Sequence, residues 1–379
     1  MPTVSPVSDP DLGGAARRLA STAGGGDPRD DLLRQSQVAR ELGSPFVSDV
    51  LAAARRQLAR APRLDARIAG WPFDPARSAM ALRLNAGLHA LARRGTIADL
   101  STLYAGRHRN FDRAVGEAIE LGEQTLLVWM DHPTQTNEVR RSSAFMAALS
   151  VLADQHGLPF ELFEVGASAG LNLLLDRYAH DLGGVACGQP DSGLRLTPSW
   201  QGPPPPRADV RIASAHGVDL RPLRLEDPHT CERLMSYVWP GDEVRADYLR
   251  RAMRLARAAP PAVDRQGAET WLAERLEEPQ APGTMRVVQH SMVLQYLPDA
   301  ERRTVLGSLL KAGRNATPDR PMARIGLEWN RDRSEVQLCM TQWSGRPGDG
   351  RRTILAICHP YGAAIEWRGL PRLPASVQA

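Results

Sequence analysis

The hydrophobic positions of this chain change character near residue 131. Over residues 27–131 the apolar residues recur at helical spacing, and no stretch alternates as a half-buried strand would. Four helix starts are indicated, at Asp27, Ser44, Asp74 and Asn110, the first three each followed by proline. The last of them continues through AVGEAIELGEQTLLVWM. We therefore expect a helical N-terminal domain over 27–131, preceded by a disordered tail over 1–26.

Beyond residue 131 short apolar runs alternate with amphipathic segments. A helix that begins at Thr136 or Asn137 and ends at Gly157 leads into a buried strand, FELFEV, and the helix LNLLLDRY follows. A segment near 183–208, rich in glycine and proline, is expected to be an inserted arm. Further strands are expected within 210–220, 285–297 and 322–330, separated by helices within 243–259, 267–278 and 301–313, and the chain from 336 to 367 is rich in strands. This pattern predicts an α/β fold with a mostly parallel sheet and an antiparallel C-terminal hairpin.

The turn between the first strand and its helix carries the most chemistry. It reads E-x-G-x-S-x-G, with Glu164 on the strand, Gly166 and Gly170 in the turn, and Ser168 between them. A strand that enters a glycine turn and then a helix presents backbone N–H groups to a ligand at the edge of a parallel sheet. The serine in place of a middle glycine suits a nucleoside without a pyrophosphate.

The same residues also fit a nucleophile elbow, G-x-S-x-G. Ser168 would then attack, with Asp219 and either His290 or His359 as the downstream acid and base. Two observations favour the cofactor interpretation over this one. About 155 residues without a strand signal precede the turn, and an elbow has no use for the buried carboxylate of Glu164.

Composition limits the classes of partner. With 42% hydrophobic and 24% charged residues, and no apolar run near the roughly 18 residues of a membrane span, the chain is expected to be globular, cytoplasmic and not bound to a membrane. The four cysteines are far apart and show no metal-ligand spacing, so we expect no metal. The net charge of +4 comes from arginines interspersed with acids, with Lys311 as the only lysine, so a nucleic-acid surface is not favoured and a small-molecule substrate is expected.

From about residue 132 onward the chain resembles a class I S-adenosylmethionine-dependent methyltransferase. The resemblance rests on the helix before the first strand, the E-x-G-x-S-x-G loop, GVDLRPL, VVQHSMVLQYLPDAERRTVLGSLLKAG and the strand-rich tail, in that order. The full chain more closely resembles an uncharacterised bacterial family known as a domain of unknown function (number twenty-three thirty-two). That resemblance is carried by TQTNEVRRS, EVGASAGLNLLLDRY, VWP and HS-x-V-x-x-Y. The methyltransferase resemblance implies a Rossmann-like methyltransferase domain over 132–379, S-adenosylmethionine as the cofactor, and methyl transfer to a small or medium acceptor.

The methyltransferase resemblance also implies roles for individual residues. The expected cofactor-binding residues lie in the glycine loop and after a later strand: Glu164, Gly166, Ala167, Ser168, Gly170, Asn172 and Asp219. Asp219 would lie near the adenine, and Asp176 and Asp181 are the candidates for the ribose-binding acid.

The remaining candidates would contact the acceptor or react with it. The expected catalytic residues are His290 as a base, Tyr296 and Glu328. Substrate-binding residues are expected in TQTNEVRRS, namely Asn137, Glu138 and Arg140, with Arg140 or Arg141 pairing with a carboxylate. Two other functions stay open: a degenerate methyltransferase fold that serves as a binding module, and a serine hydrolase with Ser168 as nucleophile.

Overall fold

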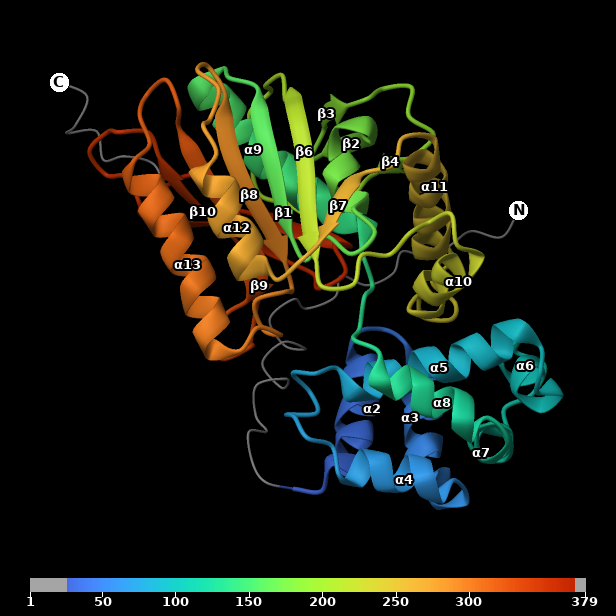
Figure 1. The fold of residues 1–379 in the computed structure, drawn as a ribbon. Coiled ribbons are helices and arrows are strands. Elements are labelled where there is room, and N and C mark those ends of the chain that lie inside the picture. The colour runs from blue at the N-terminus through green and yellow to red at the C-terminus, as the bar shows by residue number, and fades with distance from the viewer. Residues whose placement is uncertain (1–25, 372–379) are drawn as a thin grey trace. The chain divides into compact units, whose positions relative to one another are not determined.

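The computed structural model describes residues 26–371, which form two compact units (Figure 1). One unit contains the described residues up to Thr134 together with Asn330–Glu335, and the other contains Gln135–Trp329 and the chain from Val336 onward. The tail expected over residues 1–26 lies, Gly26 apart, outside the described residues. No helix in the described part of the chain is both long and apolar enough to cross a membrane.

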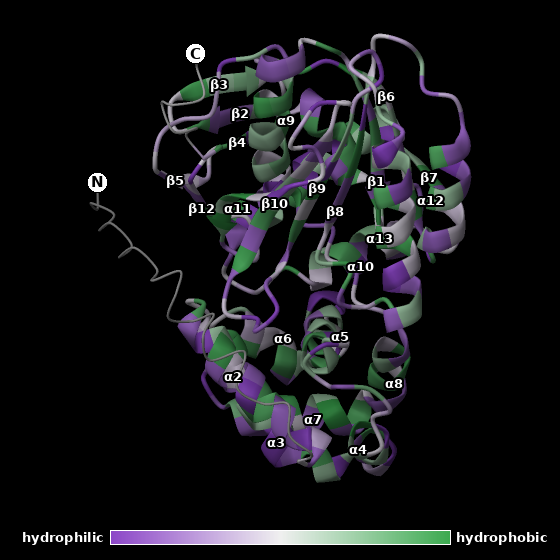
Figure 2. Cartoon of the chain, turned by 90° about the vertical axis from the view of Figure 1, so that its left-hand side faces the viewer, coloured by the Kyte–Doolittle hydropathy of each residue, from purple (hydrophilic) through white to green (hydrophobic). Residues whose placement is uncertain are grey.

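The first unit is built from helices. They are η1 (Pro28–Asp30), α2 (Asp31–Glu41), α3 (Pro45–Gln57), η2 (Leu58–Arg60), α4 (Pro62–Ala69), α5 (Met80–Arg94), α6 (Ala98–Tyr104), α7 (Phe111–Leu121) and α8 (Glu123–Asp131). Each longer helix buries one apolar side, and Leu32, Val50, Leu84 and Ile119 are fully buried. In Figure 2, hydrophobic and hydrophilic segments alternate along α2 and α3.

Two of the expected helices differ in their limits. The helix expected from Asp74 begins at Met80, because Asp74 closes a turn onto the Arg77 amide and Ala79 adopts a left-handed conformation. Asn110 caps α7 as expected, through its side-chain contact with the Arg113 amide. The helix then ends at Gly122 and restarts as α8. A side chain at Gly122 would collide with the Ala118 carbonyl, so the break requires glycine.

The second unit contains a nine-stranded sheet in the order β5-β12-β11-β10-β9-β8-β1-β6-β7 among the described residues. Its strands are β1 (Phe160–Val165), β5 (Ser199–Gln201), β6 (Ile212–Asp219), β7 (Ala262–Arg265), β8 (Met285–Ser291), β9 (Met322–Trp329), β10 (Val336–Trp343), β11 (Arg352–Cys358) and β12 (Ala364–Trp367). The neighbouring strands β7, β6, β1, β8 and β9 are parallel. Strands β10, β11 and β12 continue the sheet as an antiparallel meander. The expected mixed α/β architecture, with a largely parallel sheet and a helical N-terminal region, is confirmed.

Helices cover both faces of this sheet. The helices of this unit are η3 (Val139–Arg141), α9 (Ser142–His156), η4 (Leu171–Arg177), α10 (Pro228–Ser236), α11 (Glu243–Ala258), α12 (Ala268–Glu277) and α13 (Asp299–Arg314). In Figure 1, α12 and α13 lie in front of the sheet and α9 behind it. Successive side chains of β1 point to opposite faces of the sheet. Leu162 packs in the core that contains α9, and Phe163 and Val165 pack in the core that contains α12 and α13.

Four local predictions differ from the structure. The helix expected from Thr136 or Asn137 begins at Ser142 instead. LNLLLDRY forms a 3₁₀ helix with a kink at Leu174 rather than an α-helix. The short edge strand β7 and the helix α10 were not predicted. The segment expected as an arm begins within a separate small sheet of β2 (Ala179–Leu182), β3 (Val185–Gly188) and β4 (Arg195–Leu196), and its later part supplies β5 at the edge of the large sheet.

Two glycines of α13 provide a test of the packing of this helix on the sheet. A side chain at Gly313 would lie 2.3 Å from the Trp343 ring, whereas one at Gly307 would meet nothing within 4 Å. We expect Gly313→Ala to lower the free energy of unfolding by about 1–3 kcal/mol through overpacking. Gly307→Ala, the matched control, should raise it by about 0.5–1 kcal/mol through helix propensity. Urea unfolding followed by tryptophan fluorescence measures both, and equal effects at the two positions would contradict this packing.

Candidate functional site

The order of the parallel strands reverses between β1 and β8. The strands that follow β1 in space on one side are β6 and β7, and those on the other side are β8 and β9. At the carboxyl end of this pair, Glu164 lies beside Gln289 and Val165 beside His290. Ligands of open parallel sheets bind outside the carboxyl ends of the strands at such a reversal. The candidate site is therefore built around the glycine loop that follows β1.

The neighbouring strand β6 fixes the first half of this loop. The amides of Gly166 and Ala167 both donate to the Val218 carbonyl, at 2.9 and 3.0 Å. Ser168 adopts a left-handed conformation with φ of 58°, and its amide donates to Asp219 Oδ2 at 2.9 Å. The first three amides of the loop are thus held by the protein itself.

Asn137 fixes the second half of the loop. Its Oδ1 accepts hydrogen bonds from the amides of Ala169, at 3.1 Å, and Leu171, at 3.2 Å. Asn137 is buried and itself left-handed, with φ of 40°, a conformation that asparagine tolerates better than most residues. It caps the glycine loop rather than α9, which corrects the expectation from the sequence. It also occupies two N–H groups that a ligand would otherwise meet.

Asp219 ends the strand next to β1 and organises its surroundings. Besides the Ser168 amide, its carboxylate accepts from the Arg221 amide at 2.9 Å and from Gln135 Nε2 at 3.2 Å. The two acids considered for the ribose lie on other elements: Asp176 in η4, and Asp181 in β2, where it holds the Gly184 amide. Asp219 is therefore the acid at the end of β6, the strand next to β1. The inserted arm lengthens the sequence between the glycine loop and this acid, which obscured its position.

Glu164 is buried beneath the loop together with polar neighbours. Its side chain is in contact with Asn172 and Gln289, and burial raises the pKa of its carboxyl to about 8. At neutral pH it is therefore mostly protonated. Its Oε2, the Oε1 of Gln289 and the Oγ of Ser168 are all buried without a hydrogen-bond partner among the described residues. Buried polar atoms are nearly always paired, so such atoms indicate a missing water or ligand.

His290, Glu328 and Arg324 form a chain across β8 and β9. Arg324 Nε donates to His290 Nε2 at 3.0 Å, which places the ring proton on Nδ1, 2.7 Å from Glu328 Oε1. Burial and the charge of Arg324 lower the pKa of His290, so the ring is neutral. Both ring nitrogens are engaged, and Glu328 also accepts from the amides of Val293 and Leu294. This chain holds the turn after β8 in place.

Tyr296, the third expected catalytic residue, lies on that turn. Its side chain is 43% exposed, and its amide donates to the Val293 carbonyl. The structure thus brings His290 and Glu328 into direct contact and places Tyr296 a few residues further on, at the surface.

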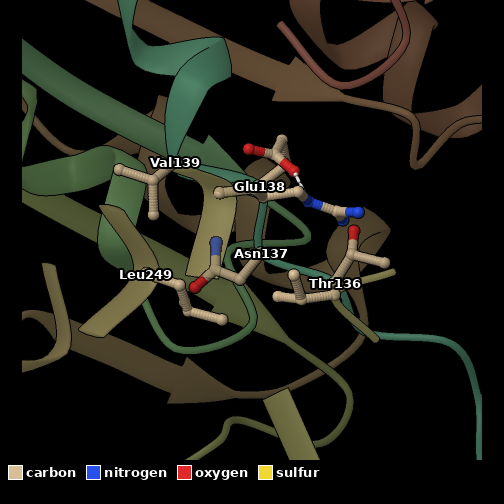
Figure 3. A pocket seen from close by; sticks show the side chains of 7 residues that line it. Thr136, Asn137, Glu138, Val139 and Leu249 are labelled. Atoms are coloured by element: carbon tan, nitrogen blue, oxygen red, sulfur yellow. Dashed lines mark hydrogen bonds and ion pairs between the residues drawn. The ribbon is translucent and has the colours of Figure 1, made fainter. Parts of the chain in front are cut away.

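The charged residues of TQTNEVRRS bind mainly one another and α11. Glu138 Oε2 lies 2.5 Å from Arg245 Nε, as the dashed line in Figure 3 marks, and Glu138 Oε1 accepts from Arg140. Burial opposes ionisation of Glu138, but Arg245, Arg140 and Arg141 together hold its pKa below the usual value. Arg140 also reaches Asp242, at 3.4 Å. Glu138 and Arg140, both expected to bind substrate, are therefore engaged in ion pairs.

A small pocket lies beside these ion pairs (Figure 3). Its volume is about 10 Å³, and it is lined by Thr136, Asn137, Glu138, Val139, Val238, Arg245 and Leu249. A cavity needs roughly 10–15 Å³ to hold one water molecule. This pocket therefore has room for about one water molecule and not for a cofactor.

Arg141 differs from its neighbours in its contacts, and no signal in the sequence distinguishes it from Arg140. It is 7% exposed, and its guanidinium donates to the Pro360 carbonyl at 3.0 Å and the Ser291 hydroxyl at 3.4 Å. Both acceptors are neutral. Two adjacent arginines before a helix look alike in sequence, because the partners of Arg141 come from distant segments, β8 and the turn after β11.

Comparison with known proteins gives one informative result. Comparisons with curated proteins and with solved structures found no significant match. The family model described as "Uncharacterized protein conserved in bacteria (DUF2332)" matches residues 29–367, which include the helical unit and the whole sheet. The chain belongs to this family of uncharacterised bacterial proteins.

Proposed function

We propose that this protein is an S-adenosylmethionine-dependent methyltransferase that acts on a small or medium acceptor. The observation that carries the proposal is the group of unpaired buried atoms at the strand reversal: Glu164 Oε2, Gln289 Oε1 and Ser168 Oγ. They lie under and within a glycine loop at the edge of the sheet where ligands of such folds bind. A polar ligand or ordered water there would supply the missing hydrogen bonds.

The strand order supports a Rossmann-like domain. Taken in chain order without the arm, the strands β1, β6, β7, β8 and β9 lie in the order 3-2-1-4-5, which is the doubly wound pattern. In that pattern an acid after the second strand accepts from the ribose hydroxyls, and Asp219 occupies this position. The meander β10 to β12 stands where the sequence resemblance implied an antiparallel hairpin.

The residues present fit the proposed cofactor. Asp219 has carboxylate lone pairs beyond its three backbone and side-chain contacts, and they suit ribose hydroxyls. Glu164 would meet the positively charged methionine end, where the bound cofactor supplies a reactive methyl group on a sulfonium. Because the amides of Ser168, Ala169 and Leu171 are already held, recognition would depend on side chains more than on the loop backbone.

Rate acceleration in this proposal comes from positioning and exclusion of water. The chain Arg324–His290–Glu328 would keep the turn after β8 in a fixed position beside the acceptor. His290 accepts a hydrogen bond at Nε2, so it serves as a base only for an acceptor that displaces Arg324. An acceptor that is nucleophilic without losing a proton is therefore the better fit.

The serine-hydrolase alternative has less support. Ser168 has the left-handed conformation of a strained turn, but its hydroxyl contacts no imidazole in the described part of the chain. The strand before it is also the first strand of the described chain, whereas the strand before a nucleophile elbow follows several earlier strands in sequence. The second alternative, a degenerate binding module, differs from the proposed enzyme because it would show no turnover.

Calorimetric titration with S-adenosylmethionine and S-adenosylhomocysteine tests the proposal directly. We expect micromolar binding to the wild-type protein and a loss of about tenfold or more in Asp219→Asn, since a hydrogen bond to a charged group contributes about 1.5–3 kcal/mol. The matched control is Asp181→Asn, on the inserted arm, which retains the Oδ1 that accepts from Gly184 and should bind like wild type. Absence of binding to the wild-type protein would contradict the proposal.

Glu164 makes the binding of a cationic ligand depend on pH. The free protein holds a proton on this carboxyl up to about pH 8, and a nearby positive charge favours the ionised form. Binding should therefore release up to one proton near pH 7, and affinity should rise with pH until about 8. Titrations in buffers of different ionisation enthalpy measure the proton release, and Glu164→Gln should abolish it.

The same variant provides a control without ligand. The pKa of Glu164 is raised from 4.5 to about 8 on folding, so the folded state holds the extra proton between these values. Stability should fall as pH rises through this window, by roughly 1.4 kcal/mol per pH unit relative to Glu164→Gln. Parallel pH dependence in the two proteins would show that Glu164 is ionised in the free state.

A further inference from the structure

Arg141 is a buried cation whose direct contacts are neutral. Its two hydrogen bonds go to the Pro360 carbonyl and the Ser291 hydroxyl, whereas the guanidinium groups of Arg140 and Arg245 both reach carboxylates. No carboxylate among the described residues forms an ion pair with Arg141. A guanidinium offers five N–H donors and stays charged, and the nearby carboxylate of Glu138 is already bound by Arg245 and Arg140, so an anion would complete the site.

The position of Arg141 places it at the edge of the sheet where the cofactor is proposed to bind. Ser291 is the last residue of β8, and Pro360 lies in the turn that follows β11. β11 runs in the same direction as β8 and β9, because two successive antiparallel pairings separate it from β9. Asp219 ends β6, on the other side of β1. Arg141 and the proposed ribose acid therefore lie on opposite sides of the glycine loop.

The surroundings of Arg141 favour an anion. Three arginines, residues 140, 141 and 245, gather with two carboxylates, Glu138 and Asp242, which leaves one positive charge. The carboxyl of Glu164 also interacts with Arg141, but its pKa of about 8 keeps it mostly protonated near neutral pH. A second N–H donor flanks the same turn: Trp239 Nε1 is buried without a partner among the described residues, and its ring stands edge-on to Tyr361 at 5.2 Å.

The backbone around Arg141 is held closely. A side chain at Gly362 would lie 2.6 Å from the carbonyl carbon of Arg140, so the turn after β11 packs directly on the segment that carries Arg141. Gly362 has φ of 67°, which favours glycine there as well. A guanidinium fixed in this way loses little entropy when it binds a planar anion through two parallel hydrogen bonds.

We propose that Arg141 binds a carboxylate group of the methyl acceptor. This inference rests on the proposed methyl transfer, since it assigns the nucleoside to the Asp219 side of the loop and the acceptor to the β8 side. A carboxylate fits the planar fork of the guanidinium and balances the single excess charge of the cluster. Arg141 is thereby a specificity-determining residue, and the acceptors are small molecules that bear a carboxylate.

Acetate serves as the probe, with acetamide as its neutral counterpart of nearly the same shape. The full chain is labelled with ¹⁵N-arginine, and the Nε–H resonance of Arg141 is identified by its absence in Arg141→Gln or, should that variant not fold, in Arg141→Lys. Both compounds are titrated at constant ionic strength, with and without saturating S-adenosylhomocysteine. Arg211→Gln, which alters an exposed arginine of the same unit, is the matched control.

We expect acetate, and not acetamide, to shift the Arg141 resonance in a saturable way, with an affinity that S-adenosylhomocysteine does not lower. Acetate affinity should fall tenfold or more in Arg141→Gln and stay unchanged in Arg211→Gln, while S-adenosylhomocysteine binds both variants like wild type. An unmoved resonance, or an equal response to acetamide, overturns the carboxylate site. Competition between acetate and S-adenosylhomocysteine overturns its assignment to the acceptor. Acetate binding without any S-adenosylhomocysteine binding supports the site and overturns the methyl-transfer function.

Discussion

The candidate site depends on how the protein satisfies the backbone amides of the loop after β1. Asp219 and Asn137, which are 82 residues apart in sequence, accept from three of these amides, and the Val218 carbonyl accepts from two more. Without these acceptors the loop would bury unpaired N–H groups, at a cost of roughly 1–3 kcal/mol each. The left-handed conformations of Asn137 and Ser168 are local strain that these hydrogen bonds stabilise.

This arrangement changes what the loop can recognise. A glycine loop whose amides are free attracts anions, as in sites that bind pyrophosphate. Here the amides are engaged, the carboxylate of Asp219 lies at the end of β6, and a second acid, Glu164, is buried and mostly protonated near neutral pH. The Asp219 side of the loop, where we propose that the nucleoside binds, is thus suited to hydroxyls and to a cation, which agrees with a sulfonium nucleoside better than with a phosphorylated one.

The sequence predicted the strands of this fold more accurately than the contacts of its loops. Buried strands such as β1 and β8 are continuous apolar runs, and their type follows from burial alone. Asn137 was expected as a possible cap of the helix α9, but it accepts instead from the amides of Ala169 and Leu171. Which N–H groups a side chain meets depends on tertiary approach, and the pattern along the chain does not encode it.

The same limit applies to Asp219, whose position after the second strand was hidden by the strands of the inserted arm. Spacing in sequence identifies a ribose acid only when strand and helix alternate without insertion, and here β2 to β5 intervene. The sequence likewise does not predict the surroundings of the two adjacent arginines at 140 and 141. Glu138 accepts a hydrogen bond from Arg140, whereas only the fold brings Ser291 and Pro360 to Arg141.

The segment that carries Asn137 and Arg141 connects the two sides of the site. Three residues separate Asn137, whose amide oxygen holds the glycine loop, from Arg141 at the β8 side, and Glu138 between them is bound to Arg245. A ligand that pulls on Arg141 therefore acts through a short, rigid segment on the loop beside which we propose that the nucleoside binds. Coupling between two sites is reciprocal in binding free energy. If both proposals hold, a cofactor that tightens the loop around Asn137 also fixes Arg141 for the acceptor, which favours ordered assembly of the reacting pair over independent binding of its members.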